Sequence, residues 1–182
     1  MDKKTKGLNA LIVILLVLTL GITVFRMTKP TSVAFKYVQC SIVVLSVLSG
    51  FAYALGGYKK NAAKFYKGFM LFFCIESLVQ LIYDVLSSSA ISATSPISSI
   101  FATIVCVNLC IITFATDLGK KTTVSLAYSV LAVLLINAVR MFVLYSSNIM
   151  LLCNYITQVI LAVIACMFVA EKYADKTARG TK

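Results

Sequence analysis

The sequence predicts an all-α integral membrane protein, built as a single bundle of six transmembrane helices with both termini on the cytoplasmic side. Three observations predict this fold: the apolar composition, the six apolar windows of membrane-spanning length, and the uneven placement of basic residues. Of the 182 residues, 60% are hydrophobic, whereas ordinary soluble domains contain about 45–50% apolar residues. Lipid therefore supplies much of the apolar surroundings, and one polytopic membrane domain covering residues 1–182 is expected.

Windows of about 20 apolar residues, the length needed to cross a bilayer core, occur six times. They cover residues 8–25, 37–56, 65–86, 96–116, 123–145 and 149–170. These runs are too long and too evenly apolar for the alternating strands of a barrel, and a helix satisfies its own backbone hydrogen bonds in lipid. Each window is therefore predicted to form one helix.

Local features support individual windows. The first follows a basic segment, as in a signal sequence, but it is longer than a signal-peptide core and lacks a small-x-small cleavage site, so it is expected to remain as a span. The second contains Ser46, Gly50 and Ala54, small residues at four-residue spacing that allow close helix packing. The fourth begins at Pro96, which suits the first turn of a helix.

The basic residues predict the orientation. With a cytoplasmic N-terminus, 13 Lys and Arg residues fall in inside segments, whereas the outside segments hold only Arg26, Lys29 and Lys36, all counted with the first loop. Cytoplasmic segments carry an excess of positive charge, so both termini are predicted to be inside, in a bacterial cytoplasmic membrane. The net charge of +11 is explained by this orientation and does not call for a nucleic-acid partner.

Polar residues within four of the windows are expected to share one depth, in the outer half or the centre of the bilayer. In the third window, "CIESLVQLIYD" places Glu76, Gln80 and Asp84 at four-residue spacing along one helix face. Such residues normally face the bundle interior, because burying them in lipid is costly. The candidate substrate-binding residues are Glu76, Gln80, Asn108, Asn137, Arg140, Asn154 and Gln158.

Two interpretations of these residues remain open. Arg140 is predicted to form an ion pair with Glu76 or Asp84, because an unpaired guanidinium at that depth is costly. The amides then either fix the helix packing or line an outward-opening pocket, bordered by the windows from residue 65 to 170, for a small polar solute.

An enzyme is not expected, because histidine is absent and no catalytic constellation is assembled. No cofactor is expected. The six cysteines all lie in apolar windows and are interpreted as reduced packing residues rather than metal ligands. The preferred interpretation is a solute-binding or transport subunit. The alternative is a scaffold or accessory subunit whose polar residues serve helix packing or bind a partner membrane subunit.

In architecture alone, the predicted topology resembles the substrate-binding subunits of energy-coupling-factor vitamin importers. The resemblance rests on the number of spans, the cytoplasmic termini, the short chain and the outward site. It implies a subunit that captures a solute and depends on partner proteins for energy. The alanine-rich pattern by which such subunits dock through their first span is not evident in "LNALIVILLVLTLGI".

The predicted orientation is tested by labelling with a membrane-impermeant maleimide in intact cells. Single cysteines at Ser92 and Asn148 are expected to react from outside, whereas those at Lys60 and Lys121 are expected to react only after permeabilisation. The parent protein measures the background from the native cysteines. The reverse labelling pattern would contradict the orientation.

Overall fold

In the computed structural model, the described residues are 3–28, 34–56, 62–86, 94–114, 120–145 and 149–179, and all are helical. The helices are α1 (Lys3–Thr28), α2 (Ala34–Gly56), α3 (Ala62–Leu86), α4 (Thr94–Phe114), α5 (Lys120–Tyr145) and α6 (Ile149–Arg179). Some side chains inside these helices, including those of Asp84 and Arg140, lie outside the described set. For the described part of the chain, the all-α prediction is confirmed.

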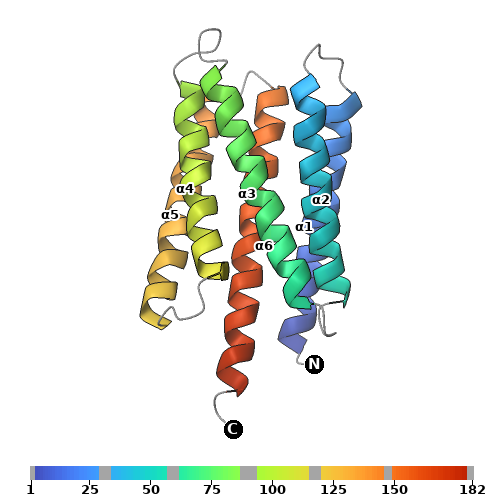
Figure 1. Cartoon of the computed structure of the whole chain (residues 1–182), viewed down its shortest axis with the longest axis vertical. Coiled ribbons are helices and arrows are strands. Elements are labelled where there is room, and N and C mark those ends of the chain that lie inside the picture. Colours follow the sequence, from blue (N-terminus) through green and yellow to red (C-terminus); the bar gives the residue numbers. More distant parts are fainter. Residues whose placement is uncertain are drawn as a thin grey trace.

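The helices stand side by side, and successive helices run in opposite directions (Figure 1). Helix α6 contacts α1, α3, α4 and α5 and is thus central to the bundle. Contacts of α1 with α2, α2 with α3, α3 with α6 and α6 with α1 close a ring of four helices, here called the four-helix group. Helices α4 and α5 pack beside this group. Helix α1 begins and α6 ends at the lower end in Figure 1, whereas α1, α3 and α5 end and α2, α4 and α6 begin at the upper end.

Four helices are long and apolar enough, within the described residues, to cross a membrane. Their spans are Gly7–Thr28, Phe35–Leu55, Lys64–Ile82 and Leu152–Ala170. The described apolar stretches of α4 and α5 are shorter, Thr103–Phe114 and Tyr128–Val139. Large apolar side chains also cover the outside of the bundle, as at Leu135 (68% exposed) and Phe142 (72% exposed). Four apolar helices with such a surface indicate an integral membrane protein in contact with lipid.

The exposed and buried faces of α3 follow helical spacing. Leu71, Ile75, Leu78 and Ile82 are exposed, at the alternating steps of four and three residues that keep side chains on one helix face. The buried face repeats these steps and changes from apolar to polar going up the helix, through Phe69, Phe73, Glu76 and Gln80.

The same change in polarity occurs on the inward faces of the other three helices of the four-helix group. On α1, the buried series from the lower end upward is Ile12, Leu16, Thr19, Thr23 and Arg26. On α2, it is Val47, Val43, Cys40, Gln39 and Lys36. On α6, it is Phe168, Ala165, Leu161, Gln158 and Asn154. The interior of the group is therefore apolar in its lower half and polar in its upper half.

An aromatic cluster fills the lower half. The ring of Phe168 on α6 lies at a centroid distance of 4.5 Å from Tyr53 on α2 and 5.1 Å from Phe69 on α3, both edge to face. Tyr66 on α3 also contacts Phe168, at 6.3 Å. Edge-to-face pairs at such distances add stabilisation beyond the area that they bury, so these rings fix α2, α3 and α6 against one another.

Gly50 allows α1, α2 and α3 to approach closely beside this cluster. A Cβ atom at this position would lie 2.9 Å from Cδ2 of Leu16 on α1 and 3.2 Å from Cδ2 of Phe69 on α3. Ser46 and Ala54, one turn away on either side, are also buried. The ridge of small residues predicted on the second window therefore packs inside the bundle, as such ridges commonly do.

Replacing Gly50 by leucine is expected to lower the unfolding temperature in detergent by several degrees, because the added side chain must displace Leu16 and Phe69. Gly21→Leu is the matched control, since Gly21 is also helical but exposed, and a Cβ atom added there would meet nothing within 4 Å. Thermal unfolding followed by circular dichroism measures both. Equal unfolding temperatures for the two variants would contradict the close packing at Gly50.

Candidate functional site

A connected set of buried polar side chains occupies the upper half of the four-helix group and is here called the polar network. Each member is at most 5% exposed. Counted along the helices at 1.5 Å per residue, the backbone positions extend from roughly 3 Å below the upper end of α1 to roughly 15 Å below that of α3. The members are Arg26 on α1, Gln39 on α2, Glu76 and Gln80 on α3, and Asn154 and Gln158 on α6.

Gln39 is the centre of the polar network. Its Oε1 accepts a hydrogen bond of 2.9 Å from Nη2 of Arg26. Its Nε2 faces three oxygens, at 2.9 Å from Oε1 of Glu76, 2.5 Å from Oε1 of Gln80 and 3.1 Å from Oδ1 of Asn154. One amide thus links all four helices of the group.

The charged members determine which way the amides point. A guanidinium only donates hydrogen bonds, so the Gln39 atom that faces Arg26 must be the oxygen. The Nε2 of Gln39 then points at the Glu76 carboxylate, which accepts. Nδ2 of Asn154 donates to Oε1 of Gln80 at 2.9 Å, which agrees with its oxygen facing Gln39. Nε2 of Gln158 lies 3.5 Å from both carboxylate oxygens of Glu76.

This chain of bonds makes Gln39 a bridge between a buried cation and a buried anion. Arg26 donates to Gln39, and Gln39 donates to Glu76. Charges in a low-dielectric interior need close partners, since each loses its hydration on burial. Lys36 adds a second cation near the upper end of α2, where it is 8% exposed and lies 5.4 Å from the ring centroid of Tyr37.

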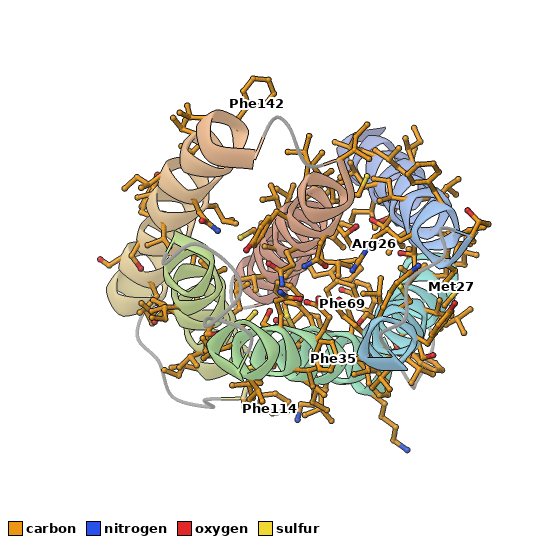
Figure 2. All side chains as sticks on the ribbon, turned by 90° about the horizontal axis from the view of Figure 1, so that it is seen from above. Arg26, Met27, Phe35, Phe69, Phe114 and Phe142 are labelled. Carbon is orange, nitrogen blue, oxygen red and sulfur yellow. The ribbon has the colours of Figure 1, made fainter. Side chains whose placement is uncertain are left out.

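Not every polar atom of the network is satisfied. Nε and Nη1 of Arg26 are buried and donate to no residue that the structure describes, and Oε1 of Gln158 accepts from none. Buried polar groups are nearly always hydrogen-bonded, and a charged donor left unpaired costs more than a neutral one. Figure 2 shows Arg26 directed into the interior, between α1 and α6.

The structure brings together four of the residues that the sequence predicted for the site: Glu76, Gln80, Asn154 and Gln158. Two others lie on the helices that pack beside the four-helix group. Asn137 on α5 is buried, with Oδ1 accepting no hydrogen bond from the described residues, and Asn108 on α4 is half-buried. The network therefore draws on α1, α2, α3 and α6, whereas the predicted pocket bordered α3 to α6.

The predicted ion pair of Arg140 with Glu76 or Asp84 involves two side chains outside the described residues, so it stays a prediction. Arg26 and Gln39, both members of the polar network, were not among the residues predicted for the site. Arg26 lies just after the first window and was counted with the first loop, although α1 continues to Thr28. A signal was available, because Arg26 lies three residues after Thr23 and seven after Thr19, on one helix face.

Comparisons with protein-family models, with curated proteins and with solved structures found no match for the chain.

Gln39→Leu is expected to destabilise the protein by about 1–3 kcal/mol, because it leaves buried donors and acceptors without partners. Ser41→Ala is the matched control on α2, since Ser41 is exposed and bonds only to the carbonyl of Tyr37 within its own helix. Chemical unfolding in mixed micelles measures the free energy of unfolding of both variants.

A second variant separates the network from general packing. The triple change Arg26→Leu, Gln39→Leu and Glu76→Leu removes both charges together with their bridge, and it is expected to recover much of the stability that Gln39→Leu loses. Equal stability of Gln39→Leu and the parent protein would contradict the bridge.

Proposed function

We propose that all six helices span the membrane, with the upper end in Figure 1 facing outside and both termini in the cytoplasm. The uneven distribution of basic residues supports this orientation. Arg26 and Lys36, counted above with the first outside loop, are buried helical residues. Without them, the outside loops keep only Lys29 of the basic residues, and the asymmetry becomes stronger. The membrane is then the cytoplasmic membrane of a bacterium.

The protein is proposed to be a solute-binding or transport subunit whose site is the polar network. One observation carries this proposal: Nε and Nη1 of Arg26 and Oε1 of Gln158 have no hydrogen-bond partner among the described residues, within an otherwise well-connected buried cluster. A small polar solute entering from the upper end supplies the missing acceptor and donor. Binding sites typically hold a few convergent polar groups of this kind in a mainly apolar setting.

A scaffold or accessory subunit is the second candidate, and a specific observation favours it. Gln39, Gln80 and Asn154 bond to one another and to Glu76, so much of the network is satisfied without a ligand. Interhelical bonds of this type fix helix packing in membranes. In this alternative, the polar network serves helix packing, and a partner subunit binds outside the bundle. Neither candidate is catalytic, because no nucleophile and base are paired in the network.

A thermal-shift screen of the purified full-length protein tests the two candidates. A solute that binds only the folded protein raises its unfolding temperature in proportion to the logarithm of its concentration. Amino acids, organic acids, nucleobases and vitamins form the panel. At least one compound is expected to stabilise the parent protein, and Glu76→Gln or Gln158→Leu is expected to remove the effect.

Tyr66→Phe serves as the control variant in this screen. The Tyr66 hydroxyl lies 2.9 Å from Oγ1 of Thr113 in the lower half of the bundle, so its loss affects stability without touching the polar network. This variant is expected to keep the response to the stabilising compound. If no compound stabilises the parent protein, the scaffold is favoured over the solute site.

A further inference from the structure

The guanidinium of Arg26 retains one complete binding edge for a carboxylate. A guanidinium has five N–H bonds, and two of its edges each present a pair of parallel N–H donors. One edge pairs Nη2 with Nε and the other pairs Nη2 with Nη1. The bond to Gln39 uses one hydrogen of Nη2, while Nε and Nη1 donate to no described residue. Whichever edge Gln39 occupies, the other still offers two parallel donors.

The charges of the network favour a ligand with a single negative charge. Arg26 is a buried cation whose Nε and Nη1 donate to no described residue, whereas Lys36 and Glu76 make further interactions. One carboxylate balances the single charge of this guanidinium, whereas a cation is repelled by it in a low-dielectric region. A planar carboxylate also accepts two parallel hydrogen bonds from one edge of a guanidinium, which adds geometric specificity to the attraction of charges.

The deeper end of the network accepts a hydrogen bond. Because Nε2 of Gln158 faces the Glu76 carboxylate, Oε1 points away from the acid, and it accepts no hydrogen bond from the described residues. A ligand that brings an N–H or O–H group to this oxygen satisfies it. The two sets of unpaired atoms are thus complementary to an acid with a donor group, the acid lying nearer the upper end.

We infer that the solute of the proposed site is a small monocarboxylate carrying a hydrogen-bond donor, with its carboxylate held by the free edge of Arg26 and its donor accepted by Gln158. This inference rests on the proposed solute-binding function and specifies its ligand class. Arg26 faces the interior rather than the lipid (Figure 2) and is 5% exposed, which favours a free solute over a lipid headgroup as the source of the anion.

Matched acid and amide pairs test the ligand class on the parent protein in a maltoside detergent. The pairs are glycolate and glycolamide, lactate and lactamide, and benzoate and benzamide, at constant sodium and chloride. Inorganic phosphate, ethylamine and phosphatidylglycerol are the further arms. At least one acid is expected to stabilise the protein, with its amide binding at least about tenfold more weakly, since a bond to a charged group is lost.

Two variants assign the contacts. Arg26→Lys keeps the charge but loses the fork, and it is expected to weaken binding of the acid about tenfold or more. Gln158→Leu is expected to weaken the binding of glycolate or lactate, while binding of benzoate, which lacks a donor group, is unchanged. Ser41→Ala, on the exposed face of α2, is expected to bind as the parent protein does.

The outcomes separate this inference from the proposed function. If amides, ethylamine or phosphate stabilise the parent protein as well as the acids do, or if no acid binds while another solute of the screen does, the carboxylate class is overturned and solute binding stands. If phosphatidylglycerol stabilises it as well as the acids do, the anion comes from lipid, and both the carboxylate class and the solute site are overturned. If no compound of either panel binds, both are overturned. Because the acid and amide pairs are compared on the parent protein, this result does not depend on the folding of any variant.

Discussion

The upper half of the bundle depends on the need to partner two opposite charges inside a low-dielectric interior. Arg26 and Glu76 lie on different helices and are 5% and 0% exposed, so each needs a partner within the protein. Gln39 partners both charges, because its amide oxygen accepts a hydrogen bond from Arg26 and its amide nitrogen donates one to Glu76. The positions of α1, α2 and α3 at this level are therefore coupled, and Asn154 extends the coupling to α6.

The lower half is held together by a different kind of interaction. Interlocking rings around Phe168 and the close approach at Gly50 fix the helices by shape. Van der Waals packing dominates there, beside the Tyr66–Thr113 hydrogen bond, because in lipid the burial of apolar surface does little to bring helices together. The two halves therefore contribute differently. Packing contacts in the lower half set the distances between helices, and directional hydrogen bonds in the upper half set which helix faces meet.

Much of the fold was predictable from the sequence, because a window of apolar residues predicts a helix without knowledge of its neighbours. The depth of four polar residues was also predictable, because it follows from their distance along a helix. These residues are Glu76, Gln80, Asn154 and Gln158. Depth does not give the direction in which a helix face points. Asn137 was therefore grouped with these residues although α5 packs beside the four-helix group.

Arg26 and Gln39 were not predicted because of their positions along the sequence. They lie at the upper edges of their windows, where a polar residue is ordinarily exposed to water or lipid headgroups. Only the continuation of α1 to Thr28 and the inward rotation of its Thr19–Thr23–Arg26 face make the guanidinium an interior group. The spacing of Thr19, Thr23 and Arg26 indicates that they share a helix face, but the inward rotation of that face depends on packing against α2 and α6.

The amide of Gln39 offers two hydrogens to three oxygens, those of Glu76, Gln80 and Asn154. At any moment, at least one of the three therefore shares a hydrogen or receives none from this amide. The oxygens at this level therefore outnumber the hydrogens that Gln39 supplies. Nδ2 of Asn154 adds a donor to Oε1 of Gln80 at 2.9 Å, so an oxygen on α3 draws its hydrogens from two neighbouring helices at once.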